Sequence, residues 1–207
     1  MDTAKIQLSA EELHLVTSEQ FILTKNRIIE KVYGLFGLLS SDYLIKHEGI
    51  FTPEIVSVLP KISKGENYGG LPYVMLDYPR YFTTENIFAI RTMFWWGNHF
   101  SITVHARGKF KHNIAQAFLT ADESMLQEPG WYIQVSGDEW QHHKTEDTHL
   151  AFGKLTEDQK RNLPQTLPFA KIAFYLPLDH WSEAAQILSA QFHFITKVIN
   201  NHQLPIR

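Results

Sequence analysis

The sequence contains no cysteine. Disulfide bonds, thiolate-bound metals, iron–sulfur clusters and cysteine nucleophiles are therefore excluded. Long apolar stretches are missing too, because the longest nearly unbroken one, Val32 to Leu39, is far shorter than the roughly 20 residues of a membrane-spanning helix. The opening stretch MDTAKIQLSAEEL has neither the basic nor the apolar part of a secretory signal. We therefore expect a cytoplasmic protein with no membrane partner.

Neither sign of charge predominates. The chain carries 19 Lys and Arg side chains against 22 Asp and Glu, without blocks of one sign. A protein that binds nucleic acid through the phosphate backbone normally presents a strongly basic surface. We therefore expect no nucleic-acid partner.

Motifs for cofactors and activated nucleophiles are also missing. Paired glycines occur only at Gly69-Gly70, without the lysine of a P-loop or the spacing of a dinucleotide fingerprint. No serine lies in a G-x-S-x-G elbow, which removes the sequence basis for an α/β-hydrolase triad. We predict no cofactor, and the sequence leaves open whether the protein is an enzyme.

The composition otherwise suits a folded protein. Hydrophobic residues make up 44% and charged residues 20% of the 207-residue chain, which is enough apolar material for one core. Internal repeats and low-complexity tracts are not apparent. We predict a single globular domain over residues 1–207. The aromatic content of 13% either fills a thick core or lines a binding face.

Two long amphipathic helices are predicted near the ends of the chain. The first runs from Ser18 to about Leu39 at helical spacing and should be interrupted at Gly37 and at Ser40-Ser41. The second should be capped by Asp179. Its apolar stripe consists of Trp181, Ala185, Leu188, Phe192, Ile195 and Ile199.

The middle of the chain is predicted to form strands. Residues 61–70 are polar and glycine-rich and are interpreted as a loop. Short helices are expected at 110–120, and after Thr156, whose capping box includes Gln159, with Pro164 as the end. Strands are expected at 71–77, 88–96, 99–107, 131–136 and 171–176, with Pro79 ending the first and Gly137-Asp138 turning a hairpin after the fourth.

This order of elements predicts an α+β fold. A mainly antiparallel sheet should be packed on one face by the long N-terminal and C-terminal helices.

The strongest hairpin signal has Gly97-Asn98 as a two-residue turn. That turn places Trp95 opposite Phe100 and Arg91 opposite Val104 on an apolar face, where Arg91 needs a partner. We expect Asp77 to be that partner in a structural ion pair.

The other face of this hairpin is predicted to mix rings with hydrogen-bonding groups. Phe88, Ile90 and Phe94 should lie there beside His105 and Arg107. Such a face suits a ligand cleft, in which apolar walls carry a few placed polar groups. The alternative is a face partly covered by a second layer of the protein.

Basic side chains crowd the start of the following helix. His105, Arg107, Lys109 and Lys111 oppose the positive end of the helix dipole unless an anion binds there. We therefore predict a site for a phosphate or carboxylate, held by these four groups with Phe88, Ile90 and Phe94 as its walls. The alternative is that the lysines point into solvent.

One cluster combines imidazole and carboxylate groups. His142, Glu146 and His149 would share one face of a helix, and two imidazoles with a carboxylate form a known metal-ligand set. The spacing is not that of HExxH, and the stretch also has the composition of a solvated connection. We expect no metal. The alternative is a metal site formed by these three residues, with His143 or Asp147 as substitutes.

Three hypotheses for function follow. The first is a binding or accessory domain whose cleft takes an anionic small molecule or an acidic partner segment. The second is a metal-assisted hydrolase or oxygenase that uses the His/Glu cluster. The third is a structural homodimer module, whose interface would be the mixed face ending in Trp96 and His99.

Overall fold

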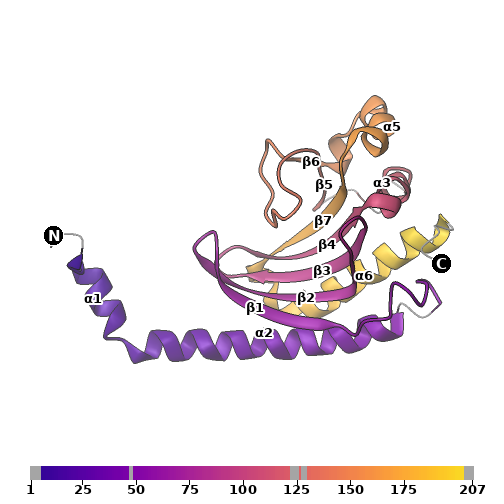
Figure 1. Ribbon diagram of the computed structural model, residues 1–207. Helices are drawn as coiled ribbons and strands as arrows, with labels where there is room; N and C mark the ends of the chain where they lie inside the picture. Colours follow the sequence, from indigo (N-terminus) through magenta and orange to yellow (C-terminus); the bar gives the residue numbers. More distant parts are fainter. Residues whose placement is uncertain (1–5, 47–48, 122–125, 127–129, 203–207) are drawn as a thin grey trace.

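The protein is an α+β structure built on one antiparallel sheet of seven strands, with strand order β1-β2-β3-β4-β7-β5-β6. The computed structural model describes residues 6–46, 49–121, 126 and 130–202. The long helices α2 and α6 lie side by side against one face of the sheet (Figure 1). The predicted fold class is therefore confirmed.

The described helices are α1 (Ala10–Val16), α2 (Glu19–Lys46), α3 (Lys111–Leu119), α5 (Glu157–Thr166) and α6 (Ala184–Asn201). The strands are β1 (Lys61–Tyr68), β2 (Leu71–Phe82), β3 (Ile87–Trp95), β4 (His99–Arg107), β5 (Trp131–Gln134), β6 (His149–Ala151) and β7 (Ala170–Pro177). None of these helices is long and apolar enough, within the described ranges, to cross a membrane.

Helix α2 is continuous, so the interruption predicted at Gly37 and Ser40-Ser41 is wrong. The helix passes both points because its buried stripe runs along the whole segment that packs on the sheet. The Ser41 hydroxyl donates to the Gly37 carbonyl, 3.2 Å away, which satisfies it within the helix. The residues of this stripe are Ile29, Val32, Phe36, Leu39 and Tyr43.

The first hairpin was only partly predicted. The stretch interpreted as a loop contains β1, a polar edge strand paired with β2. Strand β2 also continues past Pro79, which was expected to end it. The register of the β2–β3 ladder shifts between Asp77 and Arg80, so the proline, which lacks an N–H, lies where regular pairing is broken.

The register predicted for the β3–β4 hairpin is wrong by one residue. Trp95 pairs with His99, and the turn consists of Trp96, Gly97 and Asn98, with Gly97 at a φ of 71°. A three-residue turn with a glycine in the left-handed region is the second common hairpin type. Side chains alternate between the two faces along a strand. A slip of one residue therefore places each set of β3 side chains on the same face as the set of β4 side chains that was predicted for the opposite face.

The actual faces of the sheet are more sharply divided than predicted. The buried residues on the face under the helices are apolar apart from Thr92, whose hydroxyl lies 2.9 Å from that of Tyr43 on α2. The opposite face carries the polar groups of the sheet, including Asp77, Arg91, His105 and Lys171.

The C-terminal half departs from the prediction at two helix ends. Thr156 and Gln159 form the predicted capping box of α5, but Pro164 lies inside that helix instead of ending it. Helix α6 begins at Ala184 after a 3₁₀ segment, and Asp179 does not cap it. The buried residues of its predicted stripe are Leu188, Phe192, Ile195 and Ile199. Ala184 is buried where the prediction had Ala185.

The predicted hairpin at Gly137-Asp138 is instead a long connection between β5 and β6. Residues 135–148, which we call the cover loop, fold across the polar face of the sheet, on the side opposite α2 (Figure 1). At its far end the backbone N–H of His142 donates to the Tyr68 hydroxyl at 2.6 Å, so the loop reaches the end of β1.

Candidate functional site

An ion pair lies under the cover loop at the middle of the sheet. Arg91 and Asp77 are directly opposed on β3 and β2. The guanidinium donates from Nε at 2.6 Å and from Nη2 at 3.0 Å to the two carboxylate oxygens. The predicted partner of Arg91 is thus confirmed, although the pair lies on the polar face rather than under the helices. His142 of the loop lies 3.3 Å from Arg91 Nη1.

The carboxylate of Glu139, in the cover loop, contacts two of the β4 side chains that were predicted to bind an anion. Its carboxylate lies 2.5 Å from Arg107 Nη1 and 3.0 Å from His105 Nε2. Burial, followed by the positive charges of Lys171, Arg91 and Arg107, lowers the pKa of His105 to about 3. His105 is therefore a neutral imidazole whose Nε2–H donates to the carboxylate. The charge of Glu139 is balanced by Arg107.

Lys171 anchors the same loop through its backbone. Its buried ammonium group donates to the carbonyl of Glu139 at 2.7 Å and to that of Gln141. Burial is the main cause that lowers the pKa of Lys171, to about 7, with the charge of Arg91 next. Strands β3, β4 and β7 therefore each hold the loop by a charge-assisted contact, through Arg91, Arg107 and Lys171.

The residues predicted to bind an anion are not gathered in one cleft. His105 and Arg107 contact Glu139, whereas Phe88, Ile90 and Phe94 lie in the core on the helix side of the sheet. Lys109 lies 3.5 Å from Glu54, with its ammonium 5.0 Å from the centre of the Phe110 ring. Lys111 donates to the Leu167 carbonyl at 2.7 Å. Binding of an external anion by these basic groups stays a prediction.

The alternative metal ligands are also apart. His142 packs against Tyr68 and Arg91, and His149 lies 2.8 Å from the Thr148 hydroxyl. Glu146 is exposed. Within the described ranges, no three His, Asp or Glu side chains are grouped so that they could hold a metal ion. The stretch is a connection between strands, as expected, in which residues 144–147 are exposed whereas His149 is buried.

The largest hollow described lies where β7 extends past the start of β5. This hollow, which we call the edge pocket, has a volume of about 630 Å³. Strand β5 begins opposite Phe174, and the Tyr175 N–H donates to the Gly130 carbonyl at 3.3 Å. Beyond that point the described residues place no strand beside β7 on this side. The β3–β4 turn and α6 complete the walls. The rings that line it are Trp131, Tyr132, Phe174 and Tyr175, together with the imidazoles of His99 and His180.

His99 is the unusual polar group of the edge pocket. Its Nε2 atom is buried and has no hydrogen-bond partner in the described part of the chain. Burial, then the charge of Lys144, lowers the pKa of His99 to about 4, so the ring is neutral near pH 7. A buried polar atom without a partner is costly, and a ligand that meets it gains a hydrogen bond.

Lys144 brings an exposed positive charge to the same place. Its ammonium group lies 4.0 Å from the centre of the Tyr132 ring and 5.6 Å from that of Tyr175. No carboxylate among the described residues forms an ion pair with it. Burial raises the pKa of Tyr175 well above its usual range, so its hydroxyl remains a potential donor.

A second hollow lies on the other side of Lys144 and Tyr132. It has a volume of about 500 Å³ and shares these two residues with the edge pocket. Glu146 and His149 also line it, together with Lys154. Lys144 therefore lies between two open spaces.

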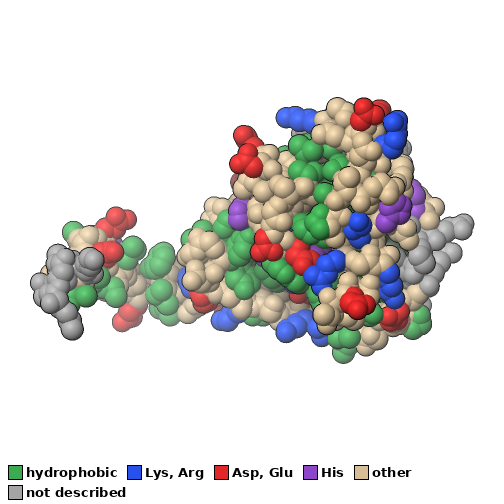
Figure 2. Space-filling model, turned by 45° about the horizontal axis from the view of Figure 1, so that its top comes forward, with side chains coloured by type: hydrophobic (Ala, Val, Ile, Leu, Met, Phe, Trp, Pro, Cys, Tyr) green, Lys and Arg blue, Asp and Glu red, His purple; other side chains and the backbone are tan. Residues whose placement is uncertain are grey.

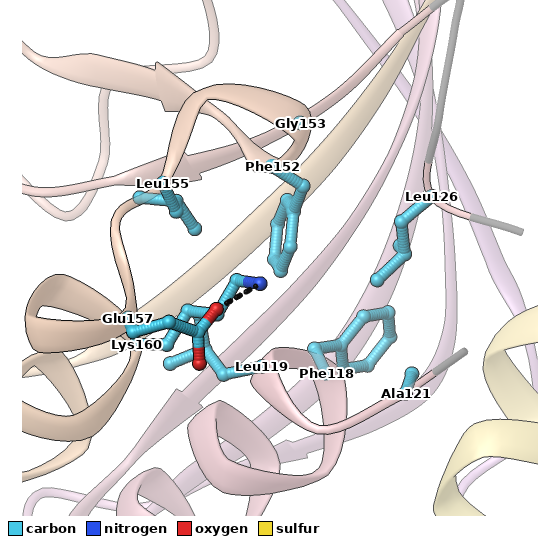
Figure 3. A pocket seen from close by; sticks show the side chains of 9 residues that line it. All are labelled: Phe118, Leu119, Ala121, Leu126, Phe152, Gly153, Leu155, Glu157 and Lys160. Carbon is cyan, nitrogen blue, oxygen red and sulfur yellow. Dashed lines mark hydrogen bonds and ion pairs between the residues drawn. The ribbon is translucent and has the colours of Figure 1, made fainter. Parts of the chain in front are cut away.

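A third hollow, between α3, α5 and the 3₁₀ segment Phe152–Lys154, is smaller. Figure 3 shows Phe118, Leu126 and Phe152 around it, with the ion pair of Lys160 and Glu157 at one side. Its volume is about 180 Å³, and the two charged groups lie 2.9 Å apart. The opposite charges of Lys160 and Glu157 offset each other, so this hollow offers a ligand little beyond apolar contact.

Sequence reasoning identified the polar character of His99 but missed Tyr132, Lys144 and Tyr175 as parts of one site. Tyr132 and Tyr175 come together only because β5 pairs with β7, which places their ring centres 5.8 Å apart. No local pattern in the sequence marks that pairing.

Comparison with known proteins gives no relative for this chain. No protein-family model matches it. No curated protein is significantly similar to it, and no solved structure is either.

Proposed function

We propose that the protein binds a small organic carboxylate with an apolar or aromatic body, and that the ligand occupies the edge pocket. The observation that carries this proposal is the coincidence, in one hollow, of His99 Nε2 and the Lys144 ammonium, which have no hydrogen-bond partner and no ion-pair partner, respectively, among the described residues.

The size and lining of the pocket support a small molecule. Ligand sites typically measure about 300–1,000 Å³ and combine apolar walls with a few polar groups. The edge pocket, at about 630 Å³, has this character, because rings from β5 and β7 form its walls. An extended acidic segment of a partner protein would suit a long groove better than this hollow.

The charges support an anion. A carboxylate beside Lys144 would form an ion pair where the described part of the chain supplies none. Lys144 and His99 are near enough for the lysine charge to lower the histidine pKa. A bound anion would offset that effect and raise the pKa of His99, so binding should strengthen as the pH falls from 7 toward 5.

The test is a calorimetric and thermal-shift titration with benzoate, indole-3-acetate and hexanoate, each compared with its neutral alcohol. At ligand concentrations 100-fold above Kd, stabilisation should reach about 2.7 kcal/mol, which raises Tm by roughly 5–10 °C in a chain of this size. The carboxylates should bind and the alcohols should not.

Two variants with the same change of charge locate the site. Lys144→Gln should weaken carboxylate binding at least tenfold. Lys197→Gln removes an exposed lysine on α6, outside the edge pocket, and should leave binding unchanged. Equal loss in both variants would indicate a general charge effect, and no binding by wild-type protein would refute the proposal.

A further inference from the structure

The N-terminal end of the structure projects away from the sheet. Helix α2 first meets the sheet near Lys25, whose ammonium lies 2.5 Å from Glu66 on β1. Upstream of this contact, residues 6–24 form what we call the arm, which consists of α1 and the first turns of α2 (Figure 1). Helix α1 contains no buried residue.

The arm is apolar although nothing in the described structure covers it. Figure 2 shows hydrophobic side chains along the projecting part. Eight large apolar side chains are each between 41 and 80% exposed there. They are Ile6, Leu8, Leu13, Leu15, Val16, Phe21, Ile22 and Leu23.

We propose that the arm pairs with the arm of a second copy of this chain, in an antiparallel, two-fold symmetric dimer centred near Ile22. This interface is separate from the edge pocket, so it stands or falls independently of the proposed ligand. It also differs from the homodimer surface predicted at Trp96 and His99. Trp96 packs with the helix-side core, while His99 lies on the polar face.

The exposed area matches what a stable dimer needs. With about 150–200 Å² for each large apolar side chain, the arm exposes on the order of 700 Å² of apolar surface per copy. If the dimer buried most of this surface in both copies, the interface would lie near the lower end of the roughly 1,200–2,000 Å² of a standard protein interface. An apolar surface of this size is rare on a monomer.

Charge complementarity sets the direction of the helices. Glu11 and Glu12 lie in the first turn of α1. Arg27 and Lys31 are exposed on α2, just beyond the arm. An antiparallel pair centred near Ile22 places the acidic end of one arm toward the basic end of the other, whereas a parallel pair would align like charges.

The decisive measurement is the molar mass of the full chain by sedimentation equilibrium at up to about 100 µM, where a micromolar complex is largely formed. We expect twice the monomer mass of 24.0 kDa. Leu13→Glu with Ile22→Glu should give the monomer. The control Leu38→Glu with Ile45→Glu also adds two charges, at sites 70 and 72% exposed on α2 outside the arm, and should remain dimeric.

Charge reversal tests the orientation. Glu11→Lys should weaken the dimer, and adding Lys31→Glu should restore it. Glu12 is left in place because its carboxylate accepts from the Ser9 N–H at 2.7 Å in the capping box of α1. A wild-type monomer at every concentration would overturn the proposal. A monomer that sediments with anionic phospholipid vesicles, and loses this with Ile22→Glu, would replace the second copy by a membrane surface. Circular dichroism confirms that each variant is folded.

Discussion

Arg91 on β3 and Asp77 on β2 lie side by side on adjacent strands and share two hydrogen bonds, of 2.6 and 3.0 Å. The pair lies beneath the cover loop, where His142 approaches the same guanidinium. An ion pair in this position holds two strands together and also gives the loop a polar surface on which to close.

Removing the arginine alone should therefore destabilise the fold. Arg91→Met leaves the carboxylate of Asp77 without its partner at a site largely screened from water, which should reduce the free energy of unfolding by about 3 kcal/mol. The double variant Arg91→Met, Asp77→Asn also removes the unpaired carboxylate charge and should recover part of the lost stability. Urea unfolding measures both. A single variant within 0.5 kcal/mol of wild type, a change of the size usual for plain surface substitutions, would contradict the structural role.

Stability should fall as the medium becomes acidic. Burial lowers the pKa of His99 and His149 to about 4, of His105 to about 3 and of His142 to about 2. In the unfolded chain each titrates near 6.5, so between about pH 4.5 and 6 the unfolded state binds more protons. The free energy of unfolding should rise with pH across this window.

Urea titrations at several pH values measure that slope. Unfolding near pH 5.5 should take up about three to four protons from these histidines, each worth about 1.4 kcal/mol per pH unit. His149→Gln should lower the uptake by about one proton. A stability that stays constant from pH 7 to pH 5 would show that these imidazoles are not neutral and buried.

The carboxylate of Glu139 should be replaceable by an external anion. Glu139→Ala leaves Arg107 and His105 without the acceptor that they share, which should cost about 2 kcal/mol of stability. Because the vacated space is lined by a guanidinium and an imidazole, acetate or formate should restore part of the loss.

Thermal unfolding with acetate, compared with chloride at equal ionic strength, checks this expectation. Glu139→Gln fills the same space without the charge and should not respond to acetate. If acetate and chloride act alike on Glu139→Ala, His105 and Arg107 do not form an anion site even when they are freed. That result would end the original prediction for this pair.

Some features of the protein were fixed by local sequence. The long α2 and α6, the capping box of Thr156 and the α+β class follow from periodicity and from side chains that act on their own backbone. The pairing of Arg91 with Asp77 was also predictable, since a guanidinium within a sheet requires a nearby carboxylate.

Tertiary structure decided the faces of the sheet and therefore the candidate site. The hairpin register depends on whether Trp96 belongs to the strand or to the turn, and both choices satisfy the alternation of side chains within each strand. Strand β1 is too polar to be recognised without β2 beside it. The edge pocket unites His99, Tyr132 and Lys144 from a hairpin, a strand and a loop, because contacts between distant segments are set by packing and not by local propensity.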